Sequence, residues 1–543
     1  MKKKLVALAL VLALAVSALS LAACGTDFSK TYKNPYEDKA YSAYLANKLK
    51  VLDSKKDVAL DANADSVSNN SNLTVFETED ENDNTVYKIY NFETETVVLT
   101  LTESETVEYE DLTASSTNID KTLYDFISVK KITTPEEGEP TTEYFIYYAD
   151  GTLAVSSKEE FKFMADATFF VKGDYYRIDK KGKFVKAGTL AENVVEALPD
   201  YMNCINEHYY NISEGTLSVY DYSFNLTNYY ELPYYNNMDD SEFFVLNDGN
   251  VLIQYSFAVS YFESDYTYYN GQNNIKVVTL IYNLKKGETK EIETEALFNN
   301  LYARGDAFGM LDYLYDDSIK NLAFVNFITN KQKDGTTKAV SVKNDGSVDR
   351  VIDNAIVAQL DVEPHSSGKF VVDTKLGSTY LVNKKGNIVA DITDATYNEK
   401  YIFVNDKIYD FDFEELATIN EDKWEYYNKM NNAFVFRCID ETDENAEKKF
   451  GLFADGVFKA ITLADGESIA DYNSRYYVIR KVADNTTTYS YYNENGAKIF
   501  DTTVFLSNKG TTRDGKVLLS GYKWDETAGK YVYTNVVLYT AAK

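Results

Sequence analysis

The chain has 543 residues, of which 45% are apolar and 15% aromatic, and its 55 basic and 85 acidic residues give a formal net charge of −30. This composition is too apolar for a disordered chain and supplies enough apolar side chains for a large core. The negative charge repels nucleic acid and anionic lipid headgroups, so we expect no nucleic-acid partner.

The first residues predict an export signal. Lys2, Lys3 and Lys4 precede an uncharged stretch, residues 5–23, made almost wholly of Leu, Val and Ala. A basic region followed by an apolar region is typical of a signal peptide. A retained membrane anchor is the alternative, because the stretch approaches the roughly 20 residues of a membrane span.

The apolar stretch ends in Leu21-Ala22-Ala23-Cys24-Gly25. This segment resembles the lipobox of bacterial lipoproteins, and the resemblance covers residues 1–25. It implies that a diacylglycerol is attached to the sulfur of Cys24, that cleavage makes Cys24 the N-terminus, and that the protein is anchored on the outer face of the cytoplasmic membrane of a Gram-positive bacterium. Without residues 1–23, 52 basic and 85 acidic residues remain, a net charge of −33.

A short helix is predicted over residues 35–54. Asn34, Pro35 and Glu37 match a helix cap, a first-turn proline and an acidic third residue, and apolar residues follow at helical spacing. A second helix is predicted over 295–304 by one apolar stripe. We therefore divide the chain into a signal peptide, 1–23, a lipidated tether with a short helix, 24–60, and a β-repeat domain, 61–543.

The repeat domain is predicted from recurring hairpins. Short aromatic or β-branched runs are joined by turns that end in glycine, as in residues 143–155 and 449–461. Glycine suits these turns because their backbone needs a positive φ. The aligned turn glycines are Gly151, Gly182, Gly215, Gly249, Gly287, Gly346, Gly386, Gly456 and Gly496. Six of the eight steps between them are 31 to 40 residues long, which is typical of a repeat architecture.

Doublets of bulky residues indicate how the strands pack. Pairs such as Phe169-Phe170, Tyr476-Tyr477 and Val536-Val537 place large side chains on both faces of a sheet, as blades packed between neighbouring blades require. We therefore predict an all-β fold, a β-propeller of seven or eight blades built from antiparallel hairpins. By pattern over residues 70–543 the body resembles diverged β-propeller lipoproteins. Two smaller propellers or a β-hairpin solenoid are the alternatives, the solenoid because residues 169–188 resemble one choline- or glucan-binding cell-wall repeat.

Signatures of catalysis are missing from the sequence. His208 and His365 have no cysteine or second histidine at ligand spacing, which argues against a zinc site. No nucleophile elbow or phosphate-binding glycine loop occurs, so we expect no catalytic residue, metal or cofactor. Cys204 and Cys438 are predicted to be isolated thiols or one disulfide. The acidic clusters 79–83 and 440–444 lack the glycine of a calcium loop and are predicted to be solvated hairpin loops.

Aromatic residues supply the candidate contact surface. The insertion at 255–274 contains Tyr261, Phe262, Tyr266, Tyr268 and Tyr269. A tyrosine has a flat apolar face and a polar tip, which suit stacking on a sugar or gripping a peptide. We therefore predict a noncatalytic binding or scaffold module for a peptide, protein or glycan at the cell envelope. A surface carbohydrate-active enzyme with two convergent carboxylates and a transporter solute-binding lipoprotein are the alternatives.

Overall fold

The structure is a computed structural model that describes Ala46 and residues 49–541 with internal gaps. The gaps are residues 69–70, 120–121, 165, 200–201, 206, 214, 233–237, 246–249, 259–274, 292–312, 317–320, 325, 332–336, 343–347, 353–355, 359, 375–377 and 384–386. The chain divides into two compact units. Unit 1 contains Met202–Asp394, and unit 2 contains Pro35–Tyr201 together with Ala395–Lys543.

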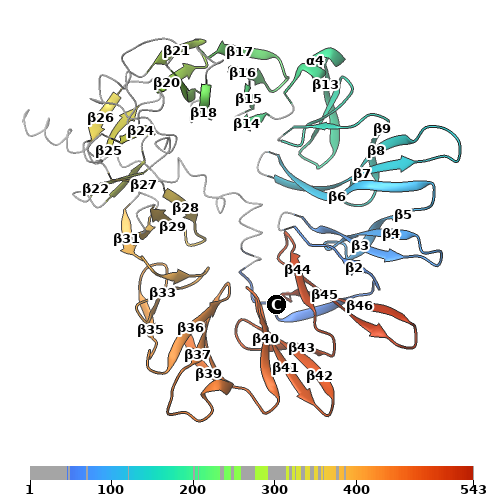
Figure 1. The fold of residues 1–543 in the computed structure, drawn as a ribbon, viewed down its shortest axis with the longest axis vertical. Coiled ribbons are helices and arrows are strands. Elements are labelled where there is room, and N and C mark those ends of the chain that lie inside the picture. Colours follow the sequence, from blue (N-terminus) through green and yellow to red (C-terminus); the bar gives the residue numbers. More distant parts are fainter. Residues whose placement is uncertain are drawn as a thin grey trace, which may run out of the picture. The chain divides into compact units, whose positions relative to one another are not determined.

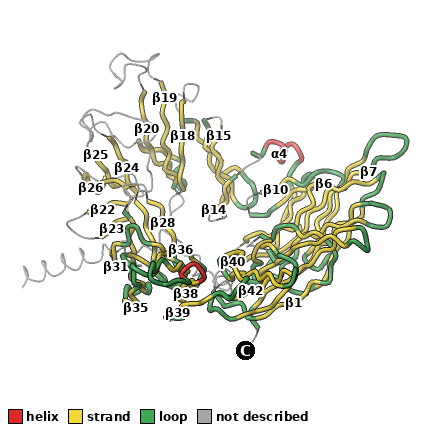
Figure 2. Tube along the Cα trace, turned by 60° about the horizontal axis from the view of Figure 1, so that its bottom comes forward, coloured by secondary structure: helices red, strands yellow, loops and turns green. Residues whose placement is uncertain are grey.

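Nearly all described elements are strands, which confirms the predicted all-β class (Figure 2). The helical elements with described bounds are α4 (Glu192–Ala197) and a 3-10 helix (Ala446–Lys448). Within the described ranges, no helix combines the length and the hydropathy of a membrane span.

Unit 2 contains seven antiparallel sheets of four strands (Figure 1). Three come from its N-terminal part: β2 (Asn63–Ala64), β3 (Leu73–Glu79), β4 (Thr85–Asn91) and β5 (Thr96–Thr102); β6 (Val107–Ile119), β7 (Thr122–Thr133), β8 (Thr141–Tyr148) and β9 (Leu153–Ser157); β10 (Lys162–Phe163), β11 (Phe169–Val171), β12 (Asp174–Ile178) and β13 (Phe184–Thr189). Three more are β32 (Thr396–Tyr397), β33 (Ile402–Val404), β34 (Lys407–Tyr409) and β35 (Glu415–Thr418); β36 (Trp424–Lys429), β37 (Ala433–Cys438), β38 (Lys449–Ala454) and β39 (Val457–Thr462); β40 (Glu467–Tyr472), β41 (Tyr476–Ala483), β42 (Thr486–Asn493) and β43 (Lys498–Thr502). The seventh sheet joins β44 (Ser507–Thr511), β45 (Val517–Asp525) and β46 (Lys530–Tyr539) to β1 (Ser54–Val58).

Unit 1 has three described sheets of four strands and two of three strands. The former are β14 (Asn203–Ile205), β15 (His208–Ser213), β16 (Thr216–Asp221) and β17 (Leu226–Glu231); β18 (Met238–Val245), β19 (Val251–Ala258), β20 (Ile275–Asn283) and β21 (Glu288–Glu291); β28 (Leu360–Pro364), β29 (Phe370–Thr374), β30 (Thr379–Val382) and β31 (Ile388–Asp391). The latter are β22 (Tyr313–Asp316), β23 (Asn321–Phe324) and β27 (Ile356–Ala358); β24 (Asn326–Lys331), β25 (Thr337–Val342) and β26 (Val348–Ile352).

The turn glycines explain why the sheets outnumber the prediction. Six of the nine have positive φ, as expected, and the other three lie outside the described residues. Five of these six, all except Gly215, join the third and fourth strands of different sheets. Each such hairpin therefore marks one whole sheet. The described residues form twelve small sheets, more than the seven or eight predicted as blades.

The bulky doublets pack as predicted, with one residue on each face of a sheet. Tyr476 and Tyr477 are both at most 1% exposed, yet they belong to two different hydrophobic clusters, one on each side of the sheet β40 to β43. Val536 and Val537 divide in the same way between two clusters. Apolar burial on both faces therefore stabilises these sheets. The segment 169–188, which suggested a solenoid, lies within one four-stranded sheet, as β11, β12 and most of β13.

An N-terminal strand completes the sheet formed by the C-terminal strands. β1 pairs antiparallel with β46, from Ser54 opposite Tyr539 to Val58 opposite Asn535. The helix predicted over 35–54 lies mostly outside the described residues, but its last residue, Ser54, begins this strand. The prediction was wrong there because β46 offers backbone partners that local sequence does not reveal. The helix predicted over 295–304 also lies outside the described residues.

Candidate functional site

The residues singled out from the sequence lie largely outside the described part of the chain. Cys24 and the aromatic set Tyr261, Phe262, Tyr266, Tyr268 and Tyr269 are in ranges that the structure does not describe. The two acidic clusters are found where predicted, in the β3–β4 hairpin loop and in the loop after β37. In the second cluster, Asp440 accepts hydrogen bonds from Thr442 and contacts Lys423. These interactions together hold the pKa of the Asp440 carboxyl down at about 2.

Of the histidines and cysteines considered in the sequence, His365 is held by hydrogen bonds within a turn. His365 is 6% exposed in the turn between β28 and β29, where its Nδ1 lies 2.9 Å from the Ser367 hydroxyl and accepts the Ser367 backbone N–H at 3.1 Å. Cys204 and Cys438 are half-buried, and neither forms a disulfide in the described ranges. Those ranges also contain no group of His, Cys, Asp or Glu arranged to hold a metal ion.

The segment Leu49–Leu52, which directly precedes β1, is held by side chains from several sheets of unit 2. Each of its four backbone carbonyls accepts one side-chain hydrogen bond. The donors are Asn432 Nδ2 to Leu49 O at 2.9 Å, Arg475 Nη2 to Lys50 O, Thr540 Oγ1 to Val51 O at 2.8 Å and Asn493 Nδ2 to Leu52 O at 2.9 Å. Because only backbone atoms accept, this cradle fixes the path of the chain rather than its side chains.

A fully buried carboxylate, that of Glu494, lies beside this cradle. It accepts the backbone N–H of Asn432 at 2.9 Å and a hydrogen bond from the Asn432 side chain. Burial raises the pKa of Glu494 to about 7, although the Asn432 hydrogen bonds and the charges of Arg475 and Lys400 act in the opposite direction. Glu494 therefore changes charge near neutral pH.

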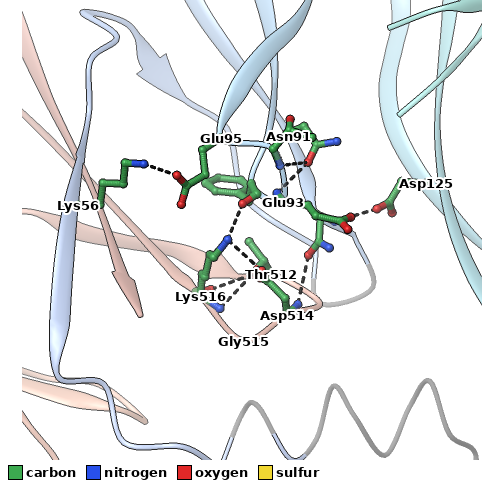
Figure 3. A network of polar contacts seen from close by, with 12 residues as sticks. Lys56, Asn91, Glu93, Glu95, Asp125, Thr512, Asp514, Gly515 and Lys516 are labelled. Carbon is green, nitrogen blue, oxygen red and sulfur yellow. Dashed lines mark hydrogen bonds and ion pairs between the residues drawn. The ribbon is translucent and has the colours of Figure 1, made fainter. Parts of the chain in front are cut away.

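A second polar network joins three consecutive sheets where β1 completes the fold of unit 2 (Figure 3). The Arg513 guanidinium, in the β44–β45 turn, donates to both oxygens of Asp125 on β7, at 3.1 and 2.7 Å. The Asp125 side chain is only 4% exposed, and it also accepts the Asn72 backbone N–H at 3.3 Å. Asn72 Oδ1 in turn accepts the backbone N–H of Asp514 at 3.1 Å. The oxygens of Asp125 and of the Asn72 side chain thus all accept hydrogen bonds from other protein groups, so the network has a structural role.

Loops between the first and second strands of neighbouring sheets in unit 2 are hydrogen-bonded in series. The contacts are Glu399 N to Asn431 O, Asn431 N to Ser474 O, Arg475 Nη1 to Gly515 O and Arg513 N to Ser71 O. Each joins one sheet to the next in the order of the strands. Three of the four contacts join backbone groups that would otherwise need other partners, and the fourth is donated by the Arg475 side chain.

The β45–β46 hairpin carries the most prominent exposed aromatic cluster in the described ranges. Tyr522 lies opposite Tyr533 and Trp524 opposite Tyr531, so all four side chains share one face. Neighbouring ring centroids are 5.1 to 5.8 Å apart. Tyr522, Trp524 and Tyr531 are 61%, 53% and 52% exposed. We call these four residues the aromatic hairpin face.

The aromatic hairpin face extends a buried surface into solvent. Toward the base of β45, Leu518 and Ser520 point to the same side and are buried, and Leu518 packs against residues of the sheet β2 to β5. β1 pairs only as far as Asn535, so the outer part of the hairpin projects beyond it. The sequence contained part of the signal, because Lys523 separates Tyr522 from Trp524 on β45, whereas β46 keeps the bulky run 531–533.

No protein-family model and no curated protein matches the chain. Solved structures with some likeness include a eukaryotic initiation factor, with 10% identity over 82% of this chain and 89% of that chain and a TM-score of 0.27. A europium-containing methanol dehydrogenase has 8% identity over 70% and 92%, with a TM-score of 0.21. The dihydro-heme d1 dehydrogenase NirN in complex with DHE has 11% identity over 56% and 76%, with a TM-score of 0.17. At these scores the likenesses carry no conclusion about this chain.

Proposed function

We propose that this chain is a lipid-anchored extracytoplasmic protein whose small sheets are β-propeller blades, and that it binds a peptide, protein or glycan at the cell envelope without chemical turnover. Two features support the propeller. The four-stranded antiparallel sheets follow one another along the chain, and β1 supplies the last strand of the sheet that contains β44 to β46. An N-terminal strand in that position is what the closure of a ring of blades requires.

The observation that carries the binding role is the aromatic hairpin face. Tyr and Trp are the residues most enriched at the energetic centres of interfaces, and leaving them exposed forgoes the free energy of burial. Three of the four side chains on this face are more than half exposed. A contiguous exposed aromatic surface of this kind marks an interaction site.

The buried carboxylates support a noncatalytic role. Asp125 is bound to Arg513, and Glu494 to Asn432, both inside the packed body of unit 2. A general acid or base has to reach a substrate proton. These two groups instead hold the protein together.

Anchoring is tested by substitution of Cys24 in the full chain. Cys24→Ala removes the sulfur that would carry the lipid, so we expect the protein to leave the membrane fraction and to lose labelling by fatty acid. Cys438→Ala is the matched control and leaves both unchanged. Membrane association that survives Cys24→Ala would point to a retained apolar span in residues 5–23.

Binding without turnover is tested with the full chain in detergent. It is incubated with peptidoglycan fragments, envelope glycans and purified envelope proteins, and both retention and product masses are measured. Retention of one of these without new products is the expected result. Cleavage of a glycan would contradict the noncatalytic proposal.

A further inference from the structure

An N-terminal segment of unit 2, residues 49–58, is bound to the rest of the unit in two ways. The carbonyls of residues 49–52 lie in the cradle of side-chain donors described above. Residues 54–58 form β1 and pair with β46. Between these two attachments, the Leu52 side chain is fully buried in the cluster that contains Tyr491 and Leu538. We call residues 49–58 the strap.

The cradle shares a side chain with a buried carboxyl group. Asn432 Nδ2 donates both to the Leu49 carbonyl, at 2.9 Å, and to one oxygen of Glu494. The Asn432 backbone N–H donates to the other oxygen of Glu494 at 2.9 Å. Asn493, which directly precedes Glu494, donates to the Leu52 carbonyl. Glu494 is therefore linked directly to two of the four residues that hold the strap.

The charged groups near Glu494 leave its carboxyl without an ion-pair partner. Four titratable groups in three turns act on Glu494 or lie beside it: Arg475, Lys400, Tyr401 and Asp455. Arg475 donates to two backbone carbonyls, Lys400 pairs with Asp455 at 3.5 Å, and Lys50 on the strap is exposed. No salt bridge to Glu494 occurs in the described ranges. Burial therefore favours the neutral carboxyl while the strap is bound.

We propose that Glu494 and Asn432 form a proton-controlled latch on the strap. The strap stays bound while Glu494 is neutral. Ionisation of Glu494 favours a locally open form, in which residues 49–52 leave the cradle and β1 leaves β46, because water can then reach the carboxylate. This inference concerns regulation and goes beyond the proposed binding function.

The strap can open at a lower cost than the sheets around it. β1 lies at the edge of its sheet, in the order β1-β46-β45-β44, and is paired on one side only. Asn432 and Glu494 lie in turns that are attached to the inner strands β37 and β42, and each of these is paired on both sides. Separation of one short edge strand is a local opening, whereas movement of an inner strand disrupts a whole sheet.

Opening of the strap would lengthen the connection to the membrane. If the chain is anchored at Cys24, as proposed above, the strap lies between the lipid and the rest of unit 2. At about 3.3 Å per extended residue, its release adds roughly 30 Å to the reach of the body. The pH at the cell surface would then set how far the body extends from the membrane.

The test is hydrogen exchange with mass spectrometry on the full chain in detergent, from about pH 5 to about pH 8. The exchange rate of a fragment that covers β1 is divided by the rate of the same fragment in Glu494→Gln, which removes the intrinsic pH dependence of exchange. We expect this ratio to rise about tenfold or more across the range, because only the wild-type carboxyl ionises. A ratio that does not change with pH would overturn the proposal.

A fragment from β8, an inner strand of unit 2, separates local opening from unfolding of the whole unit. At each pH we expect β1 to exchange about tenfold or more faster than β8. Low concentrations of urea should accelerate the exchange of β8 but not that of β1, because a local opening exposes little new surface. If β1 and β8 exchange together, Glu494 acts on the unit as a whole and the latch does not exist.

Variants locate the latch. Asn432→Ala removes the shared donor, so we expect β1 to exchange about tenfold faster at about pH 6 and β8 to change less. Asn445→Ala and Glu441→Gln alter exposed residues of the same types and should leave the exchange of β1 unchanged. Equal exchange of β1 in Asn432→Ala and Asn445→Ala would show that Asn432 does not hold the strap. If Glu494→Gln does not fold, an isolated peptide of the β1 sequence replaces it as the reference for the wild-type rates.

Discussion

Replacement of Glu494 by glutamine is expected to remove a pH dependence from the stability of unit 2. Glu494 is fully buried and accepts hydrogen bonds from Asn432. Its pKa of about 7 in the folded protein lies above the usual 4.5. The folded state therefore binds the proton more tightly than the unfolded state. The resulting stabilisation is fully present below pH 4.5 and is lost as the pH rises through 7.

The magnitude follows from the two pKa values. At about 1.4 kcal/mol per pH unit, the difference between 4.5 and about 7 corresponds to about 3 to 4 kcal/mol. The wild-type chain should lose most of this between about pH 5 and about pH 8, because the buried carboxyl ionises there. Glu494→Gln keeps one acceptor for Asn432 and cannot ionise. The free energy of unfolding of this variant should therefore not fall by this amount over the same pH range.

The assay is urea denaturation of both proteins across this pH range, followed by tryptophan fluorescence. The quantity of interest is the difference between the two free energies of unfolding, in which other titrating groups cancel. Glu441→Gln, which alters an exposed glutamate, is the control and should track the wild-type chain. Parallel pH profiles for Glu494→Gln and the wild-type chain would refute the assigned role of this carboxyl.

Two further substitutions test the contacts between sheets. Arg513→Ala leaves the Asp125 carboxylate buried without its partner, so we expect a loss of about 2 to 3 kcal/mol, below the 3 to 5 typical of deeper pairs because Arg513 is 19% exposed. In the double variant, the addition of Asp125→Asn to Arg513→Ala should recover part of this loss. If Arg513→Ala loses no more stability than the surface control Lys448→Ala, the ion pair does not stabilise the fold as we expect. Tyr491→Phe removes a hydroxyl that accepts the Leu506 N–H at 2.7 Å and donates to the Leu506 carbonyl at 2.8 Å. A loss of about 1 to 2 kcal/mol in urea denaturation is expected, with Tyr489→Phe as the control, and equal effects of the two variants would argue against those bonds.

The class of fold could be predicted because its determinants are local. A turn glycine such as Gly496 needs only its own positive φ, and a doublet such as Tyr476-Tyr477 shows burial on both faces within two residues. The number of sheets was predicted too low because the recurring hairpins were fitted to a ring of seven or eight blades, whereas each of the five hairpins that join third and fourth strands belongs to a separate sheet. The first strands, such as β2 with two residues, are too short to give a pattern.

Most of the site could not be predicted, because its contacts are remote in sequence. Asp125 and Arg513 are separated by 388 residues, and neither stands in a motif. Glu494 is surrounded by Asn493 and Asn495 and reads as part of an exposed turn, although it is buried. The aromatic hairpin face is different, because its four residues are close in sequence, although their exposure depends on where the hairpin leaves the packed region.

The pairing of β1 with β46 has a consequence for folding. Residues 54–58 are among the first of the body to leave the ribosome, whereas their partners, residues 535–539, are among the last. Closing a loop of this length costs conformational entropy before any hydrogen bond is gained, and such long-range pairings form slowly. Until residues 535–539 are available, β1 lacks the strand with which it pairs. Chains truncated before β46 should therefore be degraded or aggregate instead of forming a smaller stable body.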